Sequence, residues 1–70
     1  MLFQEVVSSK IKSIGYYPSE KILEIVFIAS GTYQYVGVSA KTHKAFLEAK
    51  SKGRFFGGVI KDKYLCRKIG

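Results

Sequence analysis

The chain has 70 residues, which is enough for one small domain and leaves no room for a second core. Hydrophobic residues make up 47% of it and charged residues 24%, a balance that excludes an intrinsically disordered chain. One cysteine and one histidine exclude an intrachain disulfide framework and a conventional multi-ligand zinc site. We therefore expect one domain over residues 1–70, with no metal and no cofactor.

Positive charge is concentrated in the second half of the sequence. The net charge is +7, from 12 lysines and arginines against 5 carboxylates. Residues 1–40 carry three lysines and three glutamates, whereas residues 41–68 carry nine cations and two carboxylates. A field of one sign attracts polyanions, so the charge favours a nucleic acid as partner. The other interpretation is that the charge serves only solubility.

The sequence shows no targeting segment and no membrane span. Its start lacks a basic region, and Glu5 interrupts the first apolar run. The longest uninterrupted apolar run covers residues 25–29, far short of the roughly 20 residues that a span needs. We expect a cytoplasmic protein without membrane contact.

Alternating apolar residues predict three strands, over residues 11–17, 21–28 and 32–37. Pro18 places a turn between the first two strands. Gly31 places a hairpin turn between the second and third, since glycine tolerates a positive φ. The middle strand is apolar on both faces except at Glu24, which is typical of a central strand. Together the three strands predict an antiparallel meander.

The apolar period then changes to that of a helix. Ser39 is the expected N-cap of a helix over residues 40–50, with Ala45, Phe46 and Ala49 on its inner side. The predicted fold class is α+β: the three-stranded meander followed by two short helices packed on one face.

The second of these helices follows from an apolar pattern over residues 55–64. It contains Gly57 and Gly58, which either allow close backbone docking or leave the helix partly formed. Residues 64–69 are a candidate fourth strand at the edge of the sheet.

The usual patterns of catalytic residues are missing. His43 has no acid or cysteine near it in sequence, so we expect it at the surface or boundary. Cys66 has no neighbouring base, so we expect a buried or inert thiol. The glycines at 53, 57 and 58 lack the Lys-Ser/Thr ending of a phosphate loop. We therefore expect no enzyme.

Aromatic and basic residues form the remaining functional signal. Tyr33 and Tyr35 share one strand face, where they either pack as core or form a stacking platform for single-stranded RNA. Residues 50–54 carry three cations around Gly53 at a helix junction, which is either a phosphate site or a solvated turn. The predicted nucleic-acid-binding residues are Lys50, Lys52, Gly53, Arg54, Lys61, Lys63, Tyr33 and Tyr35.

Four stretches, in order, resemble the KTSC domain family, a short module named for its occurrence at the C-terminus of some lysyl-tRNA synthetases. They are VSSKI (7–11) with IGY (14–16), GTYQY (31–35) with GV (37–38), SKGRFF (51–56) and IKDKY (60–64). The Tyr-x-Tyr at Tyr33 and Tyr35 matches the central signature of the family. The association with a tRNA-charging enzyme implies RNA binding, in agreement with the charge.

The function expected from the sequence is that of a small non-enzymatic module that binds nucleic acid, RNA first, through phosphate contacts. Neutralising about five phosphates predicts a slope near −3.5 in a plot of log affinity against log salt concentration for a single strand. The alternative is a protein-interaction or accessory regulatory module with no nucleic-acid contact, which an exposed apolar patch would favour.

Overall fold

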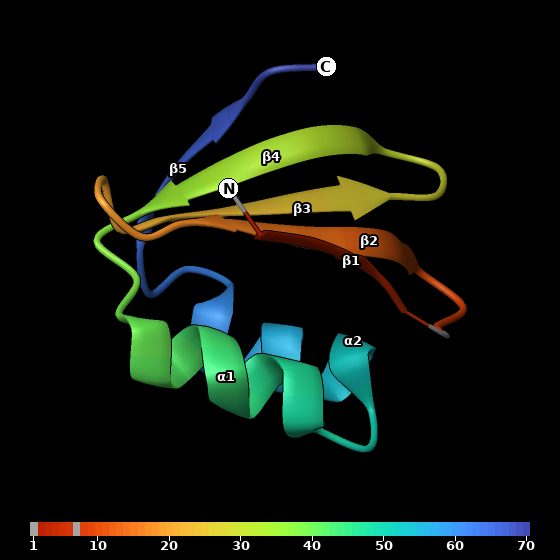
Figure 1. Ribbon diagram of the computed structural model, residues 1–70. Helices are drawn as coiled ribbons and strands as arrows, with labels where there is room; N and C mark the ends of the chain where they lie inside the picture. The colour runs from red at the N-terminus through yellow and green to blue at the C-terminus, as the bar shows by residue number, and fades with distance from the viewer. Residues whose placement is uncertain (1, 7) are drawn as a thin grey trace.

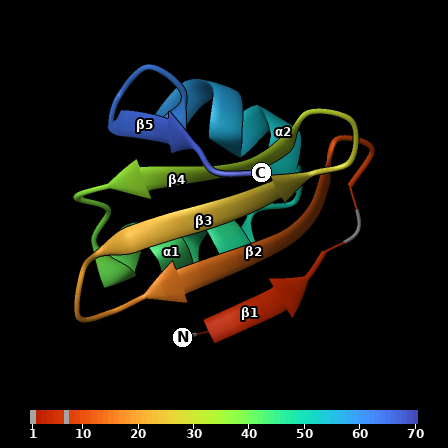
Figure 2. The ribbon, with the colours of Figure 1, turned by 90° about the horizontal axis from the view of Figure 1, so that it is seen from above.

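The computed structural model describes residues 2–6 and 8–70 as a single sheet with all helices on one of its faces (Figure 1). In chain order the elements are β1 (Leu2–Glu5), β2 (Ile11–Tyr17), β3 (Ile22–Phe27), β4 (Gly31–Val36), α1 (Ala40–Glu48), α2 (Lys52–Phe55), the π-helix η1 (Phe56–Ile60) and β5 (Leu65–Lys68). The strands lie in the order β1-β2-β3-β4-β5, each antiparallel to its neighbour (Figure 2). The α+β class is confirmed.

The predicted three-stranded meander is wrong, because the sheet has five strands. β2, β3 and β4 agree with the three predicted strands to within one residue at each end. β5 provides the short C-terminal strand at the edge of the sheet. β1 was not predicted, since its four residues are too few to show a period. Its pairing with β2, from Leu2↔Tyr16 to Glu5↔Ser13, defines it as a strand.

In each central strand, alternate side chains point toward the helices, and the register of the strands places them opposite one another. Leu23 lies opposite Tyr35, and Ile25 lies opposite both Ile14 and Tyr33. These residues share a face because successive side chains in a strand alternate. The buried apolar core between sheet and helices comprises Ile11, Ile14, Tyr16, Leu23, Ile25, Tyr35, Val38, Phe46 and Ile60.

Two local signals in the sequence are confirmed. Gly31 adopts a φ of +93° in the β3–β4 turn, a conformation that side-chain-bearing residues rarely take. Ser39 caps α1, and its hydroxyl accepts a hydrogen bond from the amide of Thr42 at 3.2 Å. The hairpin and the start of the helix therefore lie where the sequence placed them.

The inner face of α1 differs from the prediction. Phe46 is buried as expected, but Ala45 is exposed and His43 is buried. The imidazole of His43 stacks on the ring of Tyr16, with 4.6 Å between ring centroids and 11° between planes. His43 and Phe46 are three residues apart, so both reach the sheet from one helix face, and their rings fill space that a methyl group cannot.

The second helix, predicted over residues 55–64, is shorter and is the π-helix η1, and the short helix α2 before it was not predicted. The Ser51 hydroxyl caps α2 by accepting from the Arg54 amide at 3.2 Å. Gly57 and Gly58 are exposed, and a Cβ on either would meet nothing within 4 Å. Close backbone docking is therefore wrong. The chain instead continues as a wider turn, in which the Lys61 amide donates to the Phe56 carbonyl.

Candidate nucleic-acid interface

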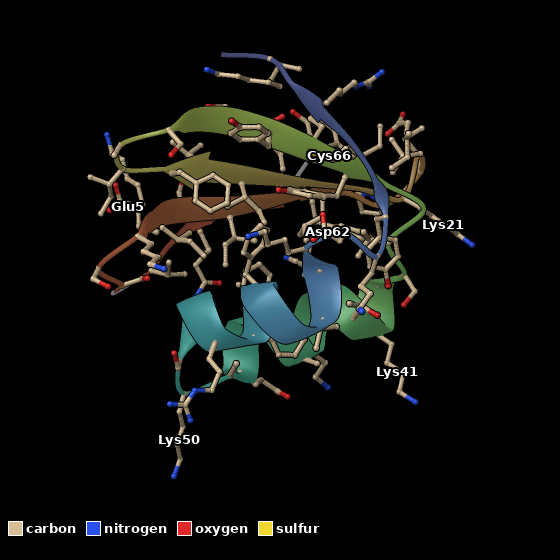
Figure 3. All side chains as sticks on the ribbon, turned by 180° about the vertical axis from the view of Figure 1, so that it is seen from behind. Glu5, Lys21, Lys41, Lys50, Asp62 and Cys66 are labelled. Carbon is tan, nitrogen blue, oxygen red and sulfur yellow. The ribbon has the colours of Figure 1, made fainter. Side chains whose placement is uncertain are left out.

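Residues 50–54 and the turn before β2 enclose a hollow of about 350 Å³, which we call the basic hollow. The side chain of Lys10 lies along Gly53, where a Cβ would be 3.9 Å from the Lys10 Cδ. Lys50 extends away from the sheet (Figure 3). The described lining residues include four cations, three serines and no carboxylate; they are Ser8, Ser9, Lys10, Lys50, Ser51, Lys52, Gly53 and Arg54.

The end of α1 shapes this hollow. Ala49 takes an extended conformation, with ψ of 138°, and so turns the chain away from the helix axis. The ammonium group of Lys52 donates to the carbonyl of Ala49, which satisfies a free acceptor at the helix C-terminus. Because the Ser51 hydroxyl already binds the Arg54 amide, that N–H is not free for an anion as the sequence suggested. The attraction for an anion therefore comes from the side chains.

A second hollow, of about 330 Å³, lies between β4 and η1, and we call it the aromatic hollow. The Tyr33 ring is partly buried and meets the ring of Phe27 edge-on at 5.6 Å and 81°. The Lys61 side chain provides a cation at the same place. The described lining residues are Phe27, Ser30, Tyr33, Tyr35, Phe56 and Lys61.

Of the two alternatives that the sequence left open, core packing holds for Tyr35. Its side chain is only 5% exposed and meets Phe56 edge-on at 5.7 Å and 74°. Burial is the main cause that raises the pKa of the Tyr35 phenol, and contact with the Cys66 thiol is the second. The face of β4 that bears both tyrosines is the one that the helices cover. Only Tyr33 remains accessible.

The turn between β3 and β4 connects the two hollows. A third hollow of about 390 Å³, the turn hollow, lies between them and shares residues with both. The amide of Ile28 donates to the carbonyl of Lys10 at 2.9 Å, which joins this turn to the one before β2. The described lining residues are Ser9, Lys10, Phe27, Ile28, Ala29 and Ser30. The turn hollow shares Ser9 and Lys10 with the basic hollow, and Phe27 and Ser30 with the aromatic hollow. We call these three adjoining hollows the band.

The structure divides the predicted binding residues between the two ends of the band. Lys50, Lys52, Gly53 and Arg54 line the basic hollow; Tyr33, Tyr35 and Lys61 line the aromatic hollow. Lys63 lies in the turn before β5 and lines none of the three hollows.

Cations outside the band are spread over other surfaces. Lys41 and Lys44 are exposed on α1, and Arg67 and Lys68 are exposed on β5. Figure 3 shows Lys41 well apart from Lys50. The structure gives no ion pair between a lysine or arginine and a carboxylate within residues 2–6 and 8–70. The described residues that line the band include no carboxylate.

Lys10 and Ile28 were missed as candidate binding residues. Lys10 was not considered, because the net charge of residues 1–40 is zero and only the second half showed an excess of cations. A local signal exists in the polar run Ser8-Ser9-Lys10, which directly precedes a strand and therefore lies at its exposed end. Ile28 was assigned to the strand, although it is the first residue beyond β3 and is 59% exposed.

Cys66 and His43 lie on different parts of the fold. Cys66 is exposed on β5, so a buried thiol is wrong. His43 stacks on Tyr16 of β2, and β3 and β4 separate β2 from β5. In the described part of the chain, no three His, Cys, Asp or Glu side chains are grouped to hold a metal ion. Nor does this part contain a helix long and apolar enough to cross a membrane.

The pattern of the KTSC domain matches residues 7–64 of the sequence. The chain belongs to the KTSC domain family. A solved KTSC domain protein from Yersinia pestis is 60% identical and matches with a TM-score of 0.95, over 97% of this chain and 96% of that chain. The family predicted from the sequence is confirmed.

Two further relatives of this KTSC domain come from other bacteria. A protein of Tsukamurella paurometabola is 39% identical over 61 residues, which are 87% of this chain and 91% of the relative. An uncharacterized protein of Stutzerimonas stutzeri is 40% identical over 57 residues, or 81% of this chain and 80% of the relative. The similarity to both therefore extends over most of each chain.

Proposed function

We propose that this KTSC domain is a non-enzymatic nucleic-acid-binding module, with RNA as the preferred ligand, and that the basic hollow binds phosphates. The observation that supports this most is the convergence of Lys10 with the cations of residues 50–54 in one hollow without a lining carboxylate. Backbone segments about 40 residues apart in sequence contribute to it. Such clustering of like charge is unfavourable in isolation and is offset when an anion binds.

Five cations line the band, namely Lys10, Lys50, Lys52, Arg54 and Lys61. Each is worth little alone, because exposed charges are screened. Together they displace counterions from a nucleic acid, and five phosphate contacts on a single strand give a slope near −3.5. The affinity should then fall about a hundredfold between roughly 50 and 200 mM salt.

The first prediction concerns the location of the charge. Replacing Lys50 and Arg54 with glutamine should weaken binding to a labelled single-stranded RNA and reduce the salt slope by about 1.4. The matched control replaces Lys41 and Lys44 with glutamine, which removes the same charge from the exposed face of α1. We expect the control to keep the wild-type slope. Fluorescence anisotropy over a series of salt concentrations measures both.

Equal losses in the two double variants would show that net charge alone governs binding and would contradict a site at the basic hollow. Absence of binding at low salt, or a flat salt response of the wild type, would remove the nucleic-acid function. Circular dichroism of each variant establishes that the fold is kept.

A protein partner is the second candidate, and one observation favours it. Leu65 on β5 is 76% exposed, and Ile69 directly after the strand is also exposed. Both lie outside the band. Replacement of Leu65 with serine therefore separates the two functions, because it should leave RNA binding unchanged and weaken a protein contact made at β5.

A further inference from the structure

The band is basic at one end and more apolar in its middle. The turn hollow is lined by Phe27, Ile28 and Ala29 between its serines. Ile28 is 59% exposed, so the band presents a large apolar side chain to solvent between the four cations of the basic hollow and Lys61 of the aromatic hollow. Phosphate groups would make no favourable contact with the exposed apolar side chain of Ile28.

The far end of the band combines a ring with cations. Tyr33 is partly buried and shares the aromatic hollow with Lys61. Lys68 lies opposite Tyr33 in the β4–β5 register, so its side chain is on the same face of the sheet. The Cε of Lys68 is 3.4 Å from the position of a Cβ on Gly31, so this side chain runs beside the hairpin turn. Lys61 and Lys68 therefore lie on the same face of the molecule as the partly buried Tyr33.

We infer that the band is a track for a single-stranded nucleic acid. This inference rests on the proposed function and names its ligand more closely. Phosphates lie in the basic hollow and near Lys61, and unpaired bases contact Ile28 and Tyr33. A duplex presents phosphates on its outside and hides the base faces in its stack, so it leaves the apolar part of the band without a partner. A single strand offers phosphates and base faces along one chain.

The experiment compares two RNA probes at one low salt concentration by fluorescence anisotropy. One is a labelled oligouridine of about ten nucleotides, and the other is an RNA duplex of the same length. Ile28→Ser removes the exposed apolar side chain, and Tyr33→Leu removes the ring while keeping an apolar group against Phe27. Leu65→Ser is the matched control, since it also removes an exposed apolar residue but outside the band.

Tyr33→Leu should weaken binding of the single strand about fivefold or more, because stacking of one base on an aromatic ring is worth at least that much. Ile28→Ser should also weaken it, because the apolar side chain that a base would cover is lost. Both variants should leave duplex binding at the wild-type level, and Leu65→Ser should change neither. Since Ile28 is exposed, its substitution tests the inference even if Tyr33→Leu disturbs packing.

Equal affinity of the wild type for single strand and duplex, or wild-type binding of the single strand by Ile28→Ser, would overturn the single-strand track. The phosphate site of the proposed function would survive that result. Salt-insensitive or absent binding of both probes would instead overturn the proposed function itself.

Discussion

His43 is a buried residue with an unpaired polar atom. Its side chain is 7% exposed, and its Nε2 atom has no hydrogen-bond partner. The ring is held instead by stacking on Tyr16, whose hydroxyl donates to the Val38 carbonyl at 2.6 Å. Burial disfavours the charged imidazolium and lowers the pKa of His43 below its ordinary value of 6.5. The folded protein therefore holds this histidine neutral at pH 7.

A pH-dependent stability follows from this residue. The unfolded chain takes up the proton on His43 at a higher pH than the folded chain does, so the stability is complete above pH 6.5 and falls as the pH drops through the folded pKa. Between about pH 7 and 5.5 the free energy of unfolding should decrease by up to about 1 kcal/mol. Urea unfolding at several pH values measures it.

His43→Phe is the control for that measurement, since it keeps a ring beside Tyr16 and removes the titration. His43 is the only histidine of the chain, so the variant should lose the pH dependence in this interval. A variant that retains the wild-type slope would show that another group causes it.

Glu24 is a buried carboxylate. Because side chains alternate along β3 and those of Leu23 and Ile25 are in the core, Glu24 lies on the face of the sheet opposite the helices. It accepts hydrogen bonds from the Tyr17 hydroxyl at 3.2 Å and from the Gln34 side-chain amide at 2.9 Å. Gln34 in turn accepts from the Arg67 guanidinium at 2.9 Å. Four residues from four strands are thus joined, which explains how a charge is tolerated in the central strand. Burial and the Glu24 carboxylate raise the pKa of Tyr17.

At the scale of elements, the β3–β4 hairpin and the C-terminal end of the chain depend on each other. The Thr32 amide donates to the Gly70 carbonyl and the Ile69 amide donates to the Thr32 carbonyl, each at 2.9 Å. These bonds continue the β4–β5 pairing to the turn. A Cβ on Gly31 would collide with the Gly70 carbonyl oxygen, so glycine is needed at this position for space as well as for its φ.

Gly31 and Gly37 allow these two requirements to be separated. Both have a positive φ, but a Cβ on Gly37 would meet nothing within 4 Å. Gly37→Ala should reduce the free energy of unfolding by about 1 kcal/mol through backbone strain alone. Gly31→Ala should cost about 2–3 kcal/mol, because the end of the chain must also move. Urea unfolding of both variants gives the comparison.

Removal of Gly70 takes away the carbonyl group that a Cβ on Gly31 would meet. In a chain that ends at residue 69, the difference in the free energy of unfolding between Gly31→Ala and Gly37→Ala should therefore be smaller. A Gly31→Ala variant no less stable than Gly37→Ala in the full-length chain would show that the C-terminal end yields without cost. That result would contradict a tight pairing of β5 with the turn.

The elements that were predicted well are those whose pattern is visible within a few residues. β2 and β3 alternate clearly, and Ser39 and Gly31 are strong local signals for a helix start and a turn. β1 and α2 were not predicted, nor was the π-helical form of η1. A strand of four residues is too short to be recognised from its own sequence and is identified only by its pairing with a neighbour. The π-helical form of η1 depends on how Phe56 and Ile60 pack against the core.

At the scale of the whole molecule, unpaired positive charge is the main feature. The net charge is +7, and the described residues form no ion pair that salt would weaken. Repulsion among the cations therefore acts against the compact state. Its range shortens as the Debye length falls with rising salt concentration.

Salt should consequently stabilise this protein. Raising sodium chloride from about 20 to 200 mM should increase the free energy of unfolding by less than about 1 kcal/mol, with urea unfolding as the measurement. The double variant with glutamine at Lys50 and Arg54 should show a smaller gain, because two members of the basic hollow are gone. A loss of stability with salt would contradict net repulsion and indicate attractive pairs instead.

The sequence alone determined the α+β class, the three central strands and the excess of cations, because each of these depends on composition or on neighbours within one element. It also determined the family, because the order of four short stretches along the chain can be seen without the fold. Only the tertiary structure decided which cations lie together, since Lys10 reaches residues 50–54 through chain packing. It likewise decided that Tyr35 and His43 are buried while Tyr33 and Ile28 are accessible. Burial depends on what covers a side chain, and the covering residues are distant in sequence.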